Sequence, residues 1–177
     1  MKATLYEEYS DQMETWACCK GFCGKKLKAS SSLKNNAGIK YDPGQLADDD
    51  KNTAWIEGNE GDGIGEFIEF EYTYDKKYID AADGACNYKD KFLILNGYQK
   101  SEIAWRENNR VKELKLFIND RLICTIQLLD KMGLQSMKID FIKLLGKKSN
   151  TIKMRFEIAA VYKGSKYSDT AISGIFW

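Results

Sequence analysis

Histidine is absent from this chain of 177 residues. Its absence excludes a Ser-His-Asp or Cys-His catalytic centre, zinc bound through imidazole and a histidine pH switch. Long apolar runs are missing too, and no stretch approaches the length that a transmembrane helix needs. The opening, "MKATLYEEYSDQMETW", is acidic and lacks the apolar centre of a signal peptide. We therefore expect either a cytoplasmic protein or an exported one whose leader lies outside this sequence.

A strong excess of one charge is also missing. The chain has 27 lysines and arginines against 26 aspartates and glutamates, a formal net charge of +1. A nucleic-acid-binding protein normally has a basic excess on one face, and a membrane-surface protein has a polybasic patch. The balance therefore argues against both a nucleic-acid partner and membrane insertion. The length suits one domain with a substantial core and is short for two.

Alternation of apolar and polar residues is the main pattern that is present. In 151–162, Ile152, Met154 and Phe156 alternate with charged residues, which predicts a half-buried strand. The same period of two marks 64–72, where Ile64 opens the apolar series, and 137–141. The apolar run 91–98 is typical of a strand covered on both faces.

The segment 112–129 predicts a β-hairpin with its turn at Asn119-Asp120. Its inward-facing residues are expected to be Leu114, Leu116, Ile118, Leu122, Cys124, Ile126 and Leu128. No window shows a convincing amphipathic helix, apart from a short turn at the N-terminus. These features predict an all-β sandwich over 27–177, preceded by an N-terminal extension, 1–26, with a cysteine cluster.

The glycine-rich segment "EGNEGDGIGE", 57–66, does not fit a nucleotide-binding loop. Its glycine spacing is not the dinucleotide fingerprint, and no Gly-Lys-Ser/Thr follows. A predicted strand comes next, whereas phosphate binding uses the N-terminus of a helix. We interpret the segment as a tight turn that leads into a strand.

The acidic segment "LADDDKNTAW", 46–55, is rich in oxygen donors suited to a hard cation such as calcium. An EF-hand fails here, because Thr53 takes the place of the glycine and Asn59 that of the bidentate glutamate. Two alternatives stay open: another oxygen cage built partly from backbone carbonyls, or a solvated turn whose Asp and Asn side chains bond their own backbone. The residue types favour the turn.

Four of the five cysteines form an even set: Cys18, Cys19, Cys23 and Cys86. In an oxidising compartment Cys18 and Cys19 would each pair with Cys23 or Cys86, because adjacent cysteines rarely bridge each other. A four-thiolate zinc site is the alternative, disfavoured by that adjacency. Cys124 is expected to be a buried thiol, and without histidine a catalytic cysteine is the least favoured interpretation.

Aromatic residues recur beside polar partners near the ends of predicted strands. Such a combination is typical of carbohydrate sites, where a ring packs on the C–H face of a sugar and charged or amide groups bind its hydroxyls. The alternative for each residue is a core aromatic with a satisfied polar tip. The candidate ligand-binding residues are Trp55, Glu57, Tyr98, Lys100, Arg110, Tyr162, Lys166, Tyr167 and Asp169.

The chain also resembles a known family. The strings "KASSSLKNN", "YDPGQLADDDKNTAWIEGNEGDGIGEFIEF", "LNGYQKSEIAWRENNRVKELKL", "LLDKMGLQSMKI" and "VYKGSKYSDTAISGIFW" together resemble the discoidin-like (coagulation factor 5/8 type C) domains. They are most similar to the bacterial branch called NADase-type glycan-binding domains. The resemblance runs from about Lys28 to Trp177 and leaves the N-terminal cysteines uncovered.

The resemblance implies a galactose-binding-like β-jelly roll of two antiparallel sheets and a non-catalytic module that binds glycans through loops at one end. It also implies a structural calcium ion in the loop from Ala47, held chiefly by Asp50 and Thr53 with the backbone near Ala171. This sequence departs from the family at Gly174, where a glutamate ligand is usual.

We expect the last loop, "VYKGSKYSDTAIS" (161–173), to form one wall of a shallow glycan site, with Gly164 allowing a tight turn that brings Tyr162 near Lys166. The host protein is expected to be exported, and other domains of a larger assembly are possible partners. A protein-binding or adhesion module on the same fold is the alternative. A glycosidase that uses the carboxylates Glu57, Glu66 and Asp169 is the third interpretation.

Overall fold

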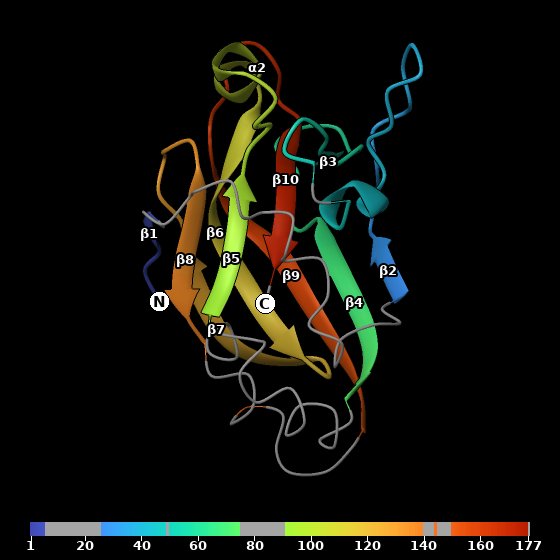
Figure 1. Ribbon diagram of the computed structural model, residues 1–177, viewed down its shortest axis with the longest axis vertical. Helices are drawn as coiled ribbons and strands as arrows, with labels where there is room; N and C mark the ends of the chain where they lie inside the picture. The colour runs from blue at the N-terminus through green and yellow to red at the C-terminus, as the bar shows by residue number, and fades with distance from the viewer. Residues whose placement is uncertain (6–25, 49, 75–90, 140–143, 145–149, 177) are drawn as a thin grey trace.

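The structure is a computed structural model that describes residues 1–5, 26–48, 50–74, 91–139, 144 and 150–176 (Figure 1). Strands dominate these ranges, which confirms the all-β prediction. The strands are β1 (Thr4–Leu5), β2 (Lys26–Ala29), β3 (Trp55–Ile56), β4 (Phe67–Tyr74), β5 (Lys91–Asn96), β6 (Asn109–Ile118), β7 (Arg121–Gln127), β8 (Leu134–Lys138), β9 (Asn150–Tyr162) and β10 (Thr170–Phe176). Within the described ranges, no helix has the length and apolar character needed to cross a membrane.

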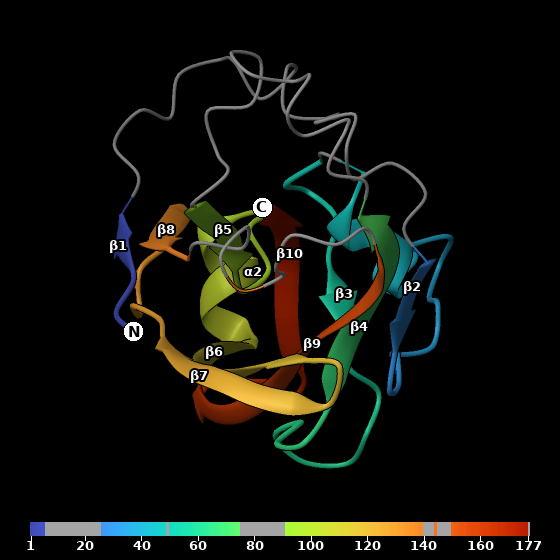
Figure 2. The same cartoon turned by 90° about the horizontal axis from the view of Figure 1, so that it is seen from below.

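The strands form two layers, which Figure 2 shows from one end. One layer has the order β1-β8-β5-β10, with β3 also paired to β10, and the other has the order β6-β9-β4-β2, with β7 paired to β6. Strand pairing within each layer is antiparallel, as expected. A short parallel pairing of β10 with β6, at Thr170 with Asn109 and Ala171 with Arg110, joins the layers. This junction lies where β6 and β10 both begin.

The main core lies between the layers and follows the predicted alternation. Ile152, Met154 and Phe156 of β9 are all buried in it. The Phe156 ring stacks on Phe92 at 4.8 Å and meets Phe70 edge-on at 6.1 Å between centroids. Each such side chain contributes roughly 1.5–3 kcal/mol to stability through burial. The core thus holds both layers rigid beneath the loops.

The predicted hairpin forms, but one of its residues faces the other way. Asn119 and Asp120 make the turn with φ of 48° and 64°, the left-handed pair that suits a tight hairpin. A β-bulge follows: Leu116 pairs with Cys124 while Phe117 pairs with Leu122. Because the bulge inserts one extra residue, Leu122 turns outward and is 51% exposed, in contrast to the prediction.

Two further predictions differ from the structure. A short helix, α2 (Glu102–Glu107), and a 3₁₀ turn, η3 (Pro43–Leu46), are present where the sequence predicted no convincing helix. The six residues of α2 are too few to give a helical period, although the Ser101 hydroxyl caps it by accepting from the Ala104 N–H. Ile64 precedes β4 and is 60% exposed, so it does not join the inward face of that strand.

The first residues of the chain take part in the sandwich. Thr4 and Leu5 pair with β8, and Ala3 packs in the main core. The predicted domain boundary after residue 26 stays a prediction. Cys18, Cys19, Cys23 and Cys86 lie outside the described residues, and so does Phe141. Cys124 packs half-buried against the core, and burial raises the pKa of its thiol.

Candidate functional site

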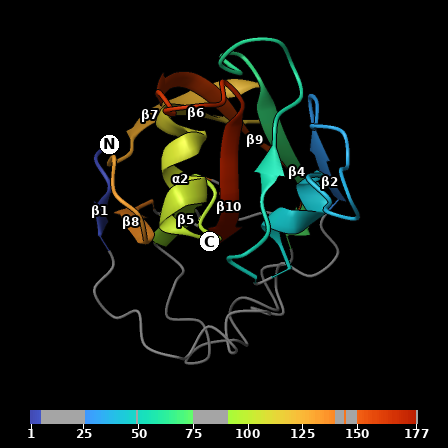
Figure 3. The same ribbon diagram turned by 90° about the horizontal axis from the view of Figure 1, so that it is seen from above.

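Three segments meet at one end of the sandwich: 57–66 between β3 and β4, 101–108 with α2, and 163–169 between β9 and β10. We call this surface the loop end. Figure 3 looks onto it and shows α2 beside β10, above the junction of the two layers. Polar contacts between the segments, described below, set the shape of this surface.

Asn109, the first residue of β6, joins two of the three segments, 57–66 and 163–169, from below. Its side chain is fully buried. Its Oδ1 accepts from the Gly164 N–H at 2.7 Å, and its Nδ2 donates to the Ser168 carbonyl at 2.6 Å and to the Asp62 carboxylate at 3.3 Å. One amide therefore bonds both ends of the loop 163–169 and the neighbouring loop 57–66. Every donor of its Nδ2 group and one lone pair of Oδ1 are used.

The loop 163–169 lies directly on the last turn of α2. Backbone N–H groups of Ser165, Lys166 and Tyr167 donate to the carbonyls of Arg106 and Glu107 at 2.9–3.2 Å. These contacts satisfy carbonyls that the end of a helix leaves free. A Cβ at Gly164 would lie 2.4 Å from the Glu107 carbonyl oxygen, so only glycine allows this approach. Glycine at position 164 is thus explained by close packing, and the tight turn predicted there stays a prediction.

Tyr167 and Lys166 present the exposed chemistry of this loop. Tyr167 is 43% exposed, and the Lys166 ammonium lies 4.8 Å from its ring centroid. The same ammonium reaches the Glu107 carboxylate at 3.4 Å. The hydrogen bond with Tyr167 and the charge of Glu107 raise the pKa of Lys166, so it stays cationic. An aromatic ring beside a cation and a carboxylate can offer both a stacking face and hydroxyl partners.

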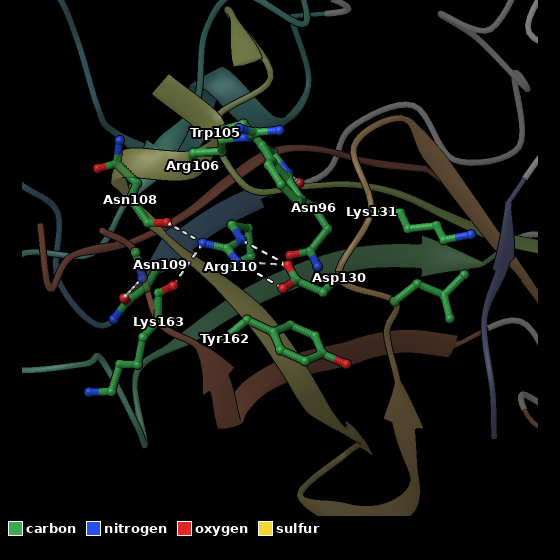
Figure 4. A network of polar contacts seen from close by, with 12 residues as sticks. Asn96, Trp105, Arg106, Asn108, Asn109, Arg110, Asp130, Lys131, Tyr162 and Lys163 are labelled. Carbon is green, nitrogen blue, oxygen red and sulfur yellow. Dashed lines mark hydrogen bonds and ion pairs between the residues drawn. The ribbon is translucent and has the colours of Figure 1, made fainter. Parts of the chain in front are cut away.

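Arg110 supports the loop end from inside (Figure 4). Its guanidinium donates to both oxygens of Asp130 at 2.8–3.0 Å and to the carbonyls of Asn108 and Lys163. It also lies 4.6 Å from the ring of Trp105. With these contacts the buried guanidinium is fully engaged. The structure therefore gives Arg110 a supporting position in place of the direct ligand contact that its residue type allowed.

Two more predicted contact residues, Trp55 and Glu57, are part of the frame. Trp55 is 0% exposed, and its indole N–H donates to the Ser31 carbonyl. Both carboxylate oxygens of the buried Glu57 accept backbone N–H groups, one from Thr170 and one from Asn59. Burial raises the pKa of Glu57, although the two hydrogen bonds oppose this effect. Neither side chain offers a surface to a ligand, because both are fully buried.

The remaining predicted residues divide between two places. Tyr162 borders the loop end, half-buried, with its hydroxyl bound to the Leu128 carbonyl, and Asp169 ends the loop. Burial raises the pKa of Asp169. Tyr98 packs in a small second cluster with Ile56, and burial raises its pKa. Exposed Lys100 precedes the N-terminus of α2, away from Tyr167 at its C-terminal end.

Two of the three carboxylates proposed for a glycosidase, Glu57 and Glu66, have anchoring contacts. Both oxygens of Glu57 bind backbone, as above, and Glu66 accepts from the hydroxyls of Ser30 and Ser31. The charges of Asp169 and Glu66 also raise the pKa of Glu57, after its burial. A general acid must reach the scissile bond, which the closed position of Glu57 does not allow. The geometry therefore lends the glycosidase interpretation no support.

The acidic loop forms a turn that satisfies its own donors. Thr53 donates to the Asp48 carboxylate at 2.8 Å, and Asp50 accepts from the backbone and side chain of Asn52 at 2.8 and 2.7 Å. The Ala171 carbonyl accepts from the Gly97 N–H, and the exposed Ala47 closes η3. Among the described residues, no group of three or more acidic, cysteine or histidine side chains could hold a metal ion. Calcium at this loop stays a prediction.

Several residues that build the loop end carried no signal in the sequence. Asp62, Glu107 and Asp130 are acidic residues in loops or a short helix, and their side-chain partners lie from 20 positions away in sequence (Asp130 and Arg110) to 163 − 62 = 101 positions away (Asp62 and Lys163). Asn109 lies next to Arg110 in the sequence, but no sequence pattern there indicates that its amide would join two loops. These residues and their partners come close together only in the folded chain.

These features agree with comparisons against known proteins. The chain matches the family model described as the NAD glycohydrolase translocation F5/8 type C domain over residues 18–177. It belongs to this family, a branch of the discoidin-like domains. The match begins before Lys28 and includes the N-terminal cysteines, which the sequence resemblance had left uncovered. No curated protein matches the chain in sequence.

Solved structures share the fold at low sequence identity. CpGH89CBM32-5 from Clostridium perfringens, in complex with GalNAc-β-1,3-galactose, has a TM-score of 0.51 at 15% identity, covering 86% of this chain and 95% of that one. The CBM32-1, CBM32-2 and M60 catalytic domains of Clostridium perfringens ZmpB give 0.56 at 14%, covering 99% and 16%. Arabinofuranosyltransferase AftD from Mycobacteria gives 0.53 at 10%, covering 87% and 10%. The chain thus spans a small part of the last two.

Proposed function

We propose that this domain is a non-catalytic module that binds glycans through its loop end. The observation that carries the proposal is Tyr167, a partly exposed ring on a loop that backbone hydrogen bonds fix to α2. A ring in a fixed position can pack on a sugar without a large loss of conformational entropy on binding. Lys166 and Glu107 beside it supply one donor and one acceptor for hydroxyl groups.

Two further facts support the proposal. Glu57 and Glu66, two of the three carboxylates considered for catalysis, are held by hydrogen bonds within the fold. The fold is shared with a CBM32 structure solved in complex with GalNAc-β-1,3-galactose. A site of this kind, open and largely polar, binds single glycans with roughly millimolar to micromolar dissociation constants.

The test is a glycan array probed with the wild-type chain, with Tyr167→Ala and with Leu122→Ala. Leu122 is an exposed side chain beside the turn at the opposite end of β6, so its replacement controls for loss of exposed surface. We expect specific binding by wild type and Leu122→Ala and its loss in Tyr167→Ala, with equal melting temperatures. Absence of binding by the folded wild-type chain would contradict the proposal.

A second candidate function rests on a different observation. Ile103 on α2 is 70% exposed and Ile64 in the loop 57–66 is 60% exposed, so the loop end also has apolar tips. Such tips suit contact with a protein or another surface. Binding of the chain to deglycosylated cell surfaces, lost in Ile103→Ser but kept in Tyr167→Ala, would favour this adhesion function over glycan binding.

The proposal also concerns the host protein in which this domain occurs. The description of the family refers to translocation. The fold also occurs within larger chains, since this chain covers 33% and 16% of two ZmpB structures. We infer that the host protein is exported and that further domains accompany this one. Secretion of the full-length protein by its native host, detected in the culture medium or on the cell surface, tests the inference.

A further inference from the structure

The cations of the loop end are all neutralised by carboxylates of the same surface. Its segments contain three: Arg106, Lys163 and Lys166. Arg106 pairs with Glu102 at 2.7 Å, Lys166 with Glu107 at 3.4 Å, and Lys163 with Asp62. A sulfate or carboxylate on a ligand would have to displace one of these partners to obtain a charged hydrogen bond.

Carboxylates also outnumber the cations there. The segments 57–66, 101–108 and 163–169 contain seven carboxylates, namely Glu57, Glu60, Asp62, Glu66, Glu102, Glu107 and Asp169. Counting the flanking Lys100, Arg110 and Lys112 together with Asp130 still leaves eight carboxylates against six cations. Of the carboxylates, Glu60 is exposed and has no ion pair among the described residues. The field above this surface therefore repels anions.

A neutral sugar does not have to displace an ion-pair partner and is not repelled by the excess carboxylates. The ion pair of Lys166 with Glu107, beside the Tyr167 ring, has both a donor and an acceptor for hydroxyls. From these contacts we infer that the site selects neutral glycans and discriminates against sialylated, sulfated and uronic acid forms of the same core. The inference rests on the proposed function and adds the ligand class and the role of Glu60 in specificity.

The size of the discrimination follows from Coulomb's law. A ligand anion about 10 Å from the two excess carboxylates, in water, loses about fourfold in affinity at low ionic strength. Salt screens charges at this separation, so the penalty should shrink as ionic strength rises. A steric cause would leave the affinity ratio independent of salt, which separates the two explanations.

The experiment uses a glycan array that contains each core in neutral, sialylated and sulfated form, read at low and high ionic strength. Wild type is compared with Glu60→Lys and with Asp120→Lys, which makes the same charge change on the turn between β6 and β7 at the opposite end. We expect wild type to bind neutral forms better, with the ratio falling in salt. Glu60→Lys should gain severalfold on acidic forms, with neutral forms and the Asp120→Lys control unchanged.

The outcomes separate this inference from the proposed function. Preferential binding of acidic glycans by wild type, or a neutral preference that neither salt nor Glu60→Lys changes, overturns the charge-based selection and leaves glycan binding intact. Absence of binding to every form, by a chain whose melting curve shows that it is folded, overturns the proposed function and this inference with it.

Discussion

The side-chain amide of Asn109 donates to the carbonyl of Ser168 at 2.6 Å, although the two residues are 59 positions apart in the sequence. The oxygen of the same amide accepts from Gly164, at the other end of the loop. The conformation of the segment with Lys166 and Tyr167 is therefore set by a buried group that a ligand cannot touch. Affinity at the loop end should depend on residues beneath it as much as on those exposed.

Replacement of Asn109 by aspartate tests this support at nearly constant shape. The new carboxylate cannot donate to Ser168 and faces Asp62, so we expect the free energy of unfolding to fall by about 1–3 kcal/mol at neutral pH. Burial and the charge of Asp62 should raise the pKa of the introduced carboxyl. Protonation would restore a donor, so the stability difference from wild type should shrink as the pH falls through that raised pKa.

Urea unfolding of wild type and Asn109→Asp at a series of pH values measures this difference. Glycan binding by the variant should weaken together with its stability at neutral pH and recover in part in acid. A difference that stays constant with pH would contradict a hydrogen-bonding role for the amide.

Gly164→Ala tests the close packing of the last loop on α2. The added Cβ would meet the backbone carbonyl of Glu107, which cannot move without disturbing the helix. We expect loss of glycan binding and a stability loss of about 1–3 kcal/mol. Ser165→Ala is the matched control, since Ser165 is exposed and its hydroxyl makes only a 3.3 Å contact with Arg106. Equal binding by both variants would show that the loop adapts.

The ion pair of Asp62 with Lys163 predicts a measurable titration shift. The hydrogen bond from Lys163 holds the pKa of Asp62 below its ordinary value of 3.8. A lowered pKa means that the pair stabilises the fold above that ordinary value and that the contribution is lost as the pH falls through the folded-state pKa. NMR titration of the Asp62 carboxyl carbon should give a midpoint below 3.8 in wild type and a higher one in Lys163→Met. Identical midpoints would exclude the pair in solution.

Calcium at the acidic loop can be decided by thermal unfolding. The hydrogen bonds of Asp50 with Asn52 and of Thr53 with Asp48 favour a self-contained turn, so we expect equal melting temperatures in calcium and in EDTA. Thr53→Val should lower the melting temperature in both, because Asp48 loses its donor. A calcium-dependent rise that Asp50→Asn abolishes would instead establish the metal site that the family resemblance implies.

The sequence predicted those parts of the fold that depend on periodicity. Alternation in 151–162 identified the longest strand and its buried face, because one side of it packs in the core. The bulge that turns Leu122 outward was not predictable, since it depends on pairing with Phe117 across the hairpin. The helix α2 was missed because six residues give too short a period.

For the candidate site, the sequence predicted an exposed loop but not the residues that hold it in place. Lys166 and Tyr167 are exposed on the predicted segment. Trp55 and Glu57 have residue types that suit a binding wall, but pairing of β3 with β10 buries Trp55, and Glu57 is buried with its carboxylate bonded to the Thr170 and Asn59 N–H groups. Residue type alone does not distinguish a buried anchor from an exposed contact. That distinction arises from the long-range pairing of strands.

The central claim is that the loop end binds glycans, and NMR mapping tests it most directly. The ¹⁵N-labelled chain would be titrated with GalNAc-β-1,3-galactose and then with the strongest ligand from the array. We predict saturable shifts concentrated at Lys166, Tyr167 and their contacts on α2, with none at the turn of Asn119 and Asp120. Shifts confined to another face, or none with any ligand, would contradict the account.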